Sequence, residues 1–315
     1  MGQHEGAERI LSKLVSWASA RDDLRGIAVV GSRARSDRPA DHWSDLDLLV
    51  MARHPGRYLA RTDWLAAIEK PWLAVKEPTP IGGQEILLVT FEGGTKVDIS
   101  VVPSRTFALA ARAVGILRRY PAAMSLLPGV ARERLLALSD VLNRGLRVVL
   151  DKDGVARHLE AGGLPMAAPT PPTEDEFADL ACRFLNEQVW IALKLRRGEL
   201  FVARTLGESR LSALLLRMIE WHARAKGIPW SASYEHGRLL ESWAPPEVIR
   251  RLDEVFPRYD AAEIWAARFA ALDLFRSLAE ETGARLGYPY PHQLEHDVMS
   301  WVRSLGDDSE RARPG

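Results

Sequence analysis

The sequence contains a single cysteine, Cys182, among its 315 residues. An intrachain disulfide and a zinc site built from several cysteines are therefore excluded, and a reducing compartment is the simplest interpretation. No apolar run approaches the roughly 18 residues of a transmembrane helix, and the N-terminus lacks the apolar core of a signal peptide. We expect a cytoplasmic protein that has no membrane partner.

The sequence also lacks net charge, because 42 Lys and Arg residues balance 42 Asp and Glu residues. A large basic surface for duplex nucleic acid is therefore not expected, and neither is a stable nucleic-acid partner. Hydrophobic residues make up 47% of the chain and charged residues 27%, which is typical of a folded globular protein. The length favours two domains, and nothing in the sequence indicates an oligomeric state.

The first half of the chain mixes helical and strand patterns. Apolar residues at helical spacing predict a helix over 7–24, and further helices are predicted over 104–118 and 131–146. Short apolar runs predict strands over 26–32, 45–52, 72–78, 85–92, 96–102 and 147–154, the last ending in a turn. Gly93 and Gly94 favour a hairpin between two of these strands, because glycine adopts positive φ easily.

Strand patterns nearly vanish in the second half. Residues 161–173 contain four prolines and two glycines, which is typical of a linker. Thr173 and Glu176 form a capping box, and helices are predicted over 174–196, 208–226, 234–243, 246–256 and 260–285. We therefore predict an α+β fold, with a mixed β-sheet flanked by helices in a domain over 1–160 and a linker over 161–173. An all-helical domain over 174–305 and a disordered tail over 306–315 complete the prediction.

The segment from Gly31 to Asp47 contains the most informative motifs. Gly31 and Ser32 end a buried strand, where a glycine lets backbone N–H groups approach an anion and a serine hydroxyl adds a donor. Asp45 and Asp47 begin another strand, and side-chain alternation places both on the face opposite its apolar residues. Two carboxylates this close repel each other unless a cation lies between them.

A third carboxylate, Asp98, lies on a later strand and again on the face opposite the apolar residues. Asp-x-Asp and Gly-Ser pairs are common in turns, so each alone indicates little. Their order is more specific: a strand, Gly-Ser, a short spacer, paired aspartates on a strand and one aspartate on a later strand. Hard carboxylate oxygens suit Mg²⁺, so this order predicts a metal site for phosphoryl or nucleotidyl transfer.

The combination resembles the nucleotidyltransferases of the DNA polymerase β superfamily. Within them, GSRAR (31–35), DHWSDLD (41–47), LLVTFEGGTKVDIS (87–100) and LDKDG (150–154) are similar to the aminoglycoside 6-adenylyltransferase, or streptomycin adenylyltransferase, family. WIALKLRRGE (190–199), MIEWH (218–222) and LGYPYP (286–291) extend the resemblance to nearly the whole chain. One departure is Leu46, because close relatives usually carry an aromatic residue between the paired aspartates.

The resemblance implies transfer of AMP from ATP to a hydroxyl of streptomycin, with Mg²⁺ as cofactor. It implies that Gly31, Ser32 and Arg33 hold the nucleotide phosphates, and that Asp45, Asp47 and Asp98 hold two Mg²⁺ ions. The guanidinium of Arg33 also matches phosphate geometry, although a surface arginine is the alternative. Asp98 is the candidate general base.

The helical domain supplies further candidates on the flank of the helix over 174–196. Lys194 could reach ATP phosphates, and Glu187 or Glu199 could bind an ammonium group or act as the base instead of Asp98. Glu220 is a third candidate for the cationic acceptor, which we expect between the domains. The alternative is an ordinary i,i+4 pair of Arg183 with Glu187 and a solvated lysine. Five tryptophans favour core positions over sugar stacking: Trp190, Trp221, Trp230, Trp243 and Trp265.

Two other functions stay open. One is a nucleotidyltransferase of this fold that acts on another small molecule, a protein or RNA. The other is a non-catalytic, antitoxin-like module that kept the fold. The intact aspartates weigh against the second, and the zero net charge weighs against RNA.

Overall fold

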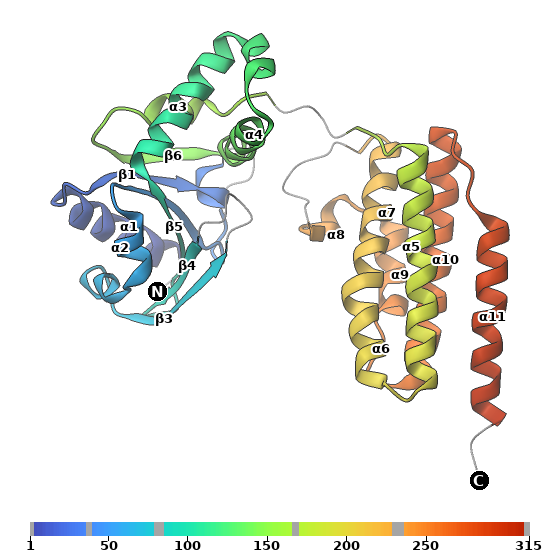
Figure 1. Cartoon of the computed structure of the whole chain (residues 1–315). Helices are drawn as coiled ribbons and strands as arrows, with labels where there is room; N and C mark the ends of the chain where they lie inside the picture. Colours follow the sequence, from blue (N-terminus) through green and yellow to red (C-terminus); the bar gives the residue numbers. More distant parts are fainter. Residues whose placement is uncertain (1–2, 36–39, 79–84, 166–169, 229–235, 312–315) are drawn as a thin grey trace. The chain divides into compact units, whose positions relative to one another are not determined.

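The computed structural model describes residues 3–35, 40–78, 85–165, 170–228 and 236–311. The chain divides into two compact units, Met1–Ala167 and Ala168–Gly315. We describe them separately as the N-terminal unit and the helical unit (Figure 1). No helix in the described part of the chain is long and apolar enough to cross a membrane.

The N-terminal unit is built on a six-stranded sheet with the order β3-β4-β5-β2-β1-β6. Its strands are β1 (Leu24–Val30), β2 (Leu46–Ala52), β3 (Pro71–Pro78), β4 (Glu85–Phe91), β5 (Lys96–Pro103) and β6 (Leu146–Asp151). β2 and β5 pair in parallel, and all other neighbours are antiparallel. The predicted mixed sheet is therefore confirmed. The β4–β5 hairpin turns at Gly93 and Gly94, both at positive φ, as expected.

Helices cover both faces of this sheet (Figure 1). α1 (Gln3–Ser19) and α2 (Pro55–Ala60) contribute to a buried cluster on one face, which we call the α1–α2 core. α3 (Ser104–Arg119) and α4 (Gly129–Arg144) contribute to a second cluster, the α3–α4 core. Short turns of 3₁₀ helix lie at Gly31–Ala34, Asp63–Ala67, Pro121–Leu126 and Arg157–Ala161. The sequence pattern predicted a tight turn at Gly31 and Ser32, but it did not predict α2 or the other three short turns.

The strand alternation predicted for β2 is confirmed in part. Leu46 and Leu48 are buried in the α1–α2 core, as expected for the apolar face. The opposite face is not left to polar residues, however, because Leu49 and Met51 pack into the α3–α4 core. That core contains residues of β1, β2, β5 and β6, but among the described residues it includes none of β3 or β4. Buried clusters therefore cover both faces of the sheet at its centre, whereas the described part of the α3–α4 core does not extend over β3 and β4.

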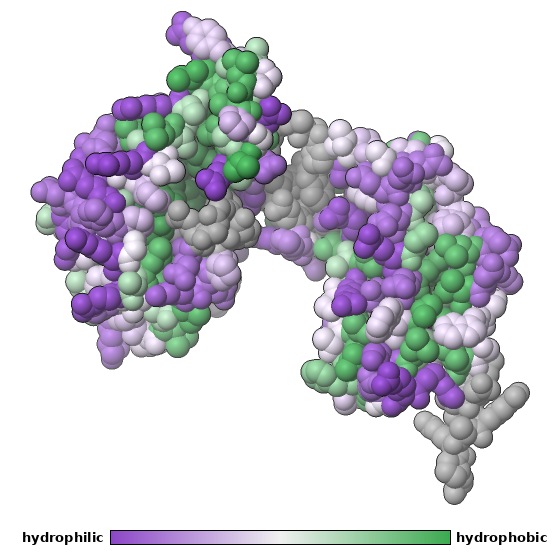
Figure 2. All heavy atoms as spheres, in the orientation of Figure 1, coloured by the Kyte–Doolittle hydropathy of each residue, from purple (hydrophilic) through white to green (hydrophobic). Residues whose placement is uncertain are grey.

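Many of the exposed apolar side chains of the N-terminal unit lie in two places, although Trp43, 80% exposed, lies in neither. One lies on edge strand β3, where Leu73 and Val75 are 62% and 51% exposed. The other lies around the end of α3 and the start of α4, with Leu126 and Val130 exposed, and Figure 2 shows hydrophobic atoms at this surface. Since the described part of the α3–α4 core does not extend over β3, its apolar residues are the ones that bear on the site described below.

The helical unit packs seven α-helices of the described chain around an aromatic and aliphatic core. They are α5 (Glu174–Arg196), α6 (Leu200–Leu206), α7 (Ser212–Ala225), α8 (Leu240–Trp243), α9 (Pro246–Val255), α10 (Ala261–Leu286) and α11 (His292–Arg311). The capping box forms as predicted, because Glu176 N donates to Thr173 Oγ1 and Thr173 N donates to Glu176 Oε2. Phe184 and Phe275 stack at a centroid distance of 4.0 Å in the core.

Several helix boundaries differ from the prediction. In place of the single helix predicted over 208–226, the chain forms a π turn, Gly207–Leu211, and then α7. The π turn also connects α7 directly to α6, which the sequence did not predict. Part of the helix expected over 234–243 lies outside the described residues, and α8 covers only its last turn. α11 continues into the expected tail, since no helix breaker follows Gly306 before Arg311. Residues 312–315 lie outside the described chain.

The predicted linker over 161–173 is anchored at both ends. Leu164 is buried in the α3–α4 core, and Asn143 Nδ2 donates to its carbonyl at 2.9 Å. At the other end, Tyr288 Oη donates to Pro172 O at 3.0 Å, and Arg224 Nη2 donates to Thr170 O at 2.7 Å. Residues 166–169 lie outside the described chain. Both ends of the proline-rich segment therefore pack against the unit they adjoin.

The tryptophans expected in the core divide into three groups. Trp221 and Trp243 are buried, and Trp265 packs against the core while partly exposed. Trp190 is 46% exposed, so its prediction was wrong: it lies on the flank of α5 that carries charged residues and not on its apolar stripe. Trp230 lies outside the described residues.

Candidate active site

The three predicted aspartates meet on one face of the sheet. Asp47 on β2 is directly opposite Asp98 on β5 in the parallel pairing, and Asp45 immediately precedes β2. Each offers a carboxylate oxygen within 4.8 Å of the others, and no other group of this kind occurs in the described part of the chain. The parallel pairing, which the sequence did not reveal, is what brings together residues 51 positions apart. We call these residues the aspartate triad.

Lys96 joins the triad and was missed by the sequence analysis. Its Nζ lies 3.2 Å from Asp45 Oδ2 and 3.6 Å from Asp98 Oδ2. Burial alone would lower the pKa of Lys96, but the charge of Asp98 and the hydrogen bond from Lys96 to Asp45 raise it overall. The ammonium group therefore supplies positive charge where two carboxylates converge. Its position two residues before Asp98, on the same strand face, was the available signal.

Asp98 is the member of the aspartate triad with a buried, unsatisfied carboxylate oxygen. Its Oδ1 is buried and has no hydrogen-bond partner among the described residues. Burial raises the pKa of Asp98, Lys96 opposes this shift, and the charges of Asp45 and Glu77 add to it. A buried carboxylate oxygen without a partner is costly unless a cation or donor satisfies it. The donor set and this unsatisfied oxygen thus fit a hard divalent cation such as Mg²⁺.

Gly31 is required next to the triad for two reasons. Its φ is +67°, in the left-handed region that favours glycine. In addition, a Cβ atom at this position would lie 2.2 Å from Asp47 Oδ2, far inside contact distance. The adjacent Ser32 Oγ is buried and has no hydrogen-bond partner among the described residues. An unsatisfied hydroxyl at this turn suits an anionic ligand with acceptor oxygens.

Arg33 contacts the backbone before the paired aspartates. Its Nε donates to Asp45 O at 2.9 Å and its Nη2 donates to Ser44 O at 2.6 Å. A turn formed by Asp41 and Ser44 supports this segment, because Ser44 Oγ donates to Asp41 Oδ1 at 2.8 Å. At least part of the guanidinium is therefore used to position Asp45, a role that the sequence analysis did not foresee.

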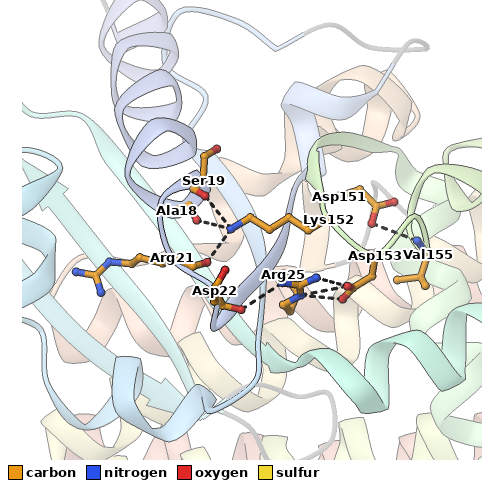
Figure 3. A network of polar contacts seen from close by, with 9 residues as sticks. All are labelled: Ala18, Ser19, Arg21, Asp22, Arg25, Asp151, Lys152, Asp153 and Val155. Atoms are coloured by element: carbon orange, nitrogen blue, oxygen red, sulfur yellow. Dashed lines mark hydrogen bonds and ion pairs between the residues drawn. The ribbon is translucent and has the colours of Figure 1, made fainter.

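The LDKDG motif (150–154) has a structural role in the N-terminal unit (Figure 3). Lys152 Nζ contacts carbonyl oxygens at and just after the end of α1, where a positive charge is favourable. These acceptors lie 2.7–3.0 Å away and belong to Ala18, Ser19 and Arg21. Asp153 accepts hydrogen bonds from Arg25, and Asp151 accepts from the backbone of Val155. The motif thus joins β6 to the end of α1.

In the helical unit, all three predicted acidic residues lie within ion-pair distance of a lysine or an arginine. Lys194 Nζ lies 2.7 Å from Glu199 Oε2, and Arg197 Nε lies 2.6 Å from Glu199 Oε1. The hydrogen bond from Lys194 lowers the pKa of Glu199, and the charges of Arg197 and Lys194 add to this shift, while burial opposes it. Glu220 Oε2 lies 3.8 Å from Arg217 Nε. Lys194, the expected phosphate contact, is therefore brought together with Glu199, the expected acceptor contact.

Glu187 differs from the other two glutamates. Its side chain is only 12% exposed, and Oε1 lies 3.6 Å from Arg210 Nη1. Its Oε2 is buried and accepts no hydrogen bond from the described residues. The predicted alternative pair of Arg183 with Glu187 was wrong, because Arg183 instead pairs with Asp179 at 2.5 Å, one turn earlier on α5. Glu187 thus keeps one buried carboxylate oxygen that no described residue satisfies.

The matches to known proteins extend over nearly the whole chain. Aminoglycoside 6-adenylyltransferases from Bacillus subtilis (strain 168) and Campylobacter jejuni are 21% and 22% identical over 291 and 286 residues. These matches cover 90% of this chain and 92% of the first relative, and 88% of each chain for the second. A crystal structure of an aminoglycoside 6-adenyltransferase from Bacillus subtilis matches with 16% identity and a TM-score of 0.43, covering 94% of this chain and 97% of that one. The sequence model of the streptomycin adenylyltransferase family matches residues 5–305, so this chain belongs to that family, as its motifs predicted.

Proposed function

We propose that this protein transfers AMP from ATP to a hydroxyl group of an aminoglycoside of the streptomycin type, with Mg²⁺ as cofactor. The observation that carries the proposal is the aspartate triad beside the Gly31–Ser32 turn. Membership of the family and the names of the curated relatives support the same activity.

The aspartate triad would hold Mg²⁺. Bound there, the metal would neutralise phosphate charge and polarise the acceptor hydroxyl. Asp98 Oδ1, which has no partner among the described residues, is one available ligand atom. Lys96 would have to share or give up its contacts with Asp45 and Asp98 as the cation binds, since these oxygens serve both.

The Gly31–Ser32 turn would bind the nucleotide phosphates. The unsatisfied Ser32 hydroxyl and the backbone of the turn supply the donors, and positive φ at Gly31 exposes that backbone. Arg33 would contribute the positive charge of its guanidinium, and it would also hold Asp45 in place. Lys194 remains a proposed phosphate contact, which requires release from Glu199.

Asp98 is the proposed base that removes the proton from the acceptor hydroxyl. A pKa raised by burial makes its carboxylate a better proton acceptor than an ordinary aspartate. Glu187 or Glu199 is the runner-up for this role. For the cationic acceptor, Glu187, Glu199 and Glu220 are the proposed contacts in the helical unit, and Glu187 has the strongest case because its Oε2 is unsatisfied.

A screen for adenylylation tests the proposal. The protein is incubated with MgATP and each of several aminoglycosides, and the products are analysed by mass spectrometry. We expect an aminoglycoside that gains one AMP group, with release of pyrophosphate. An excess of EDTA should stop the reaction. Failure of every aminoglycoside to react with folded protein would refute the proposal.

A further inference from the structure

The face of the sheet that carries the aspartate triad continues onto β4 and β3. In the strand pairing, Asp98 lies opposite Leu88 on β4, and Leu88 lies opposite Val75 on β3. Residues paired in this way share one face of a sheet. The neighbouring rows are Lys96–Thr90–Leu73 and Ser100–Ile86–Glu77. We call the six residues of β3 and β4 in these rows the β3–β4 face: Leu73, Val75, Glu77, Ile86, Leu88 and Thr90.

The β3–β4 face is apolar and accessible within its unit. Leu73 and Val75 are 62% and 51% exposed, although both are large hydrophobic residues on an edge strand. Such exposed edges are usually blunted or covered, because they favour association. Leu88 is half-buried, and its strand neighbours Leu87 and Val89 are fully buried on the other face. The hydrophobic side chains next to Asp98 thus form a platform rather than part of a closed core.

Charge gives the platform its specificity. Glu77 is exposed and lies in the row next to Asp98 and Val75. With the triad it makes this face acidic, apart from the ammonium group of Lys96. A ligand that matches it has an apolar ring face for the aliphatic side chains and a cationic group for Glu77. It also needs a hydroxyl within reach of Asp98.

We infer that the β3–β4 face binds the acceptor of the reaction, with Glu77 pairing with one of its ammonium or guanidinium groups. The inference rests on the proposed function, because it assigns the acceptor subsite of that same active site. Adjacent strands lie about 4.8 Å apart, so the track from Asp98 to Val75 is about 10 Å long. This length accommodates a sugar ring and its charged neighbour. A ring over Val75 and Leu88 would present a hydroxyl toward Asp98 while its cation lies at Glu77.

Matched variants of the hairpin test the inference. Glu77→Gln removes the proposed partner of the cation, and Glu85→Gln is the control. Glu85 is an exposed carboxylate of the same hairpin, but its register places it on the opposite face, with Leu87 and Val89. We expect Glu77→Gln to raise the KM for streptomycin about tenfold, because a charge-assisted hydrogen bond is lost. The KM for ATP should stay unchanged in both variants, and the streptomycin KM should stay unchanged in Glu85→Gln.

A second pair of variants tests the apolar platform. Val75→Lys places a cation under the proposed ring, and Ala74→Lys places one on the opposite face of the same exposed strand. Only Val75→Lys should raise the KM for streptomycin. Higher salt should reduce the difference in this KM between the two variants. Equal streptomycin KM values for Glu77→Gln and Glu85→Gln would overturn the inference while leaving the proposed function intact.

Direct binding separates the two proposals. Streptomycin is titrated calorimetrically into the wild-type protein and into the Glu77→Gln and Glu85→Gln variants. If the wild type binds streptomycin but transfers no AMP, the proposed function fails. Weaker binding by Glu77→Gln alone would then still support streptomycin binding at the β3–β4 face. If the wild type does not bind streptomycin, or if both variants bind it equally, the inference about the β3–β4 face is overturned.

Discussion

Replacing Gly31 by alanine separates backbone strain from the geometry of the aspartate triad. The residue has a φ of +67°, so an alanine there costs about 1–2 kcal/mol of folding stability. The new Cβ would also lie 2.2 Å from Asp47 Oδ2. Asp47 Cγ would lie 2.9 Å from the same Cβ, so the Asp47 side chain must shift to relieve the clash. Its main effect is to displace the carboxylate.

The size of that displacement sets the expected loss of activity. Asp47 Oδ2 must move from 2.2 Å to about the 3.4 Å at which ordinary contact begins, a shift of about 1 Å. A misplacement of about 1 Å can cost about 10²-fold in rate. We therefore expect Gly31→Ala to lower kcat about 100-fold, a loss of about 2.7 kcal/mol in transition-state stabilisation.

Gly154→Ala is the matched control. Gly154 has a φ of +66°, and a Cβ there would meet nothing within 4 Å. The Gly154→Ala variant should therefore lose as much free energy of unfolding in urea as Gly31→Ala does. Its kcat for AMP transfer, measured by pyrophosphate release, should stay at the wild-type value. If Gly31→Ala keeps wild-type kcat, or if both variants lose activity equally, the close approach of Gly31 to Asp47 is not what the site requires.

Three further results are expected. Lys96→Met removes the cation that bridges Asp45 and Asp98, so Mg²⁺ should raise its melting temperature more than that of the wild type; equal shifts would contradict the bridging role. The hydrogen bond from His222 holds the pKa of Glu281 below its usual 4.5, so this carboxylate stabilises the fold above that pH and loses its effect as pH falls through its folded pKa. Glu281→Gln should therefore be less stable than the wild type near pH 7, with urea midpoints that converge in acid; a constant difference would refute this. MgATP at about 100-fold above its Kd should stabilise the protein by about 2.7 kcal/mol, measured as a thermal shift, and no shift at millimolar MgATP would argue against nucleotide binding.

Local patterns predicted the parts of the site that depend on neighbouring residues. Side-chain alternation placed Leu46 and Leu48 in the core and Asp47 on the other face, since a strand has a period of two. The glycines at 93 and 94 predicted the hairpin that brings Asp98 into the sheet. These inferences needed no knowledge of which strands pair.

Features that depend on distant pairing could not be predicted in this way. The parallel pairing of β2 with β5 sets Asp47 opposite Asp98 and brings Lys96 to Asp45. Nothing within either strand specifies that partner. The same holds for Leu49, which shares the strand face of Asp47 and packs against the α3–α4 core. Arg33 was expected to bind phosphate because guanidinium suits it, but it also suits the backbone carbonyls that the fold places beside it.

The most direct test of nucleotidyl transfer compares the wild type with Asp47→Asn, which keeps the shape of the side chain and removes its charge. Both proteins are incubated with MgATP and streptomycin, and adenylylated product is measured by mass spectrometry, with circular dichroism to check folding. We predict product from the wild type and none from the folded variant, because Asp47 is a member of the aspartate triad. Wild-type turnover by Asp47→Asn would contradict the account.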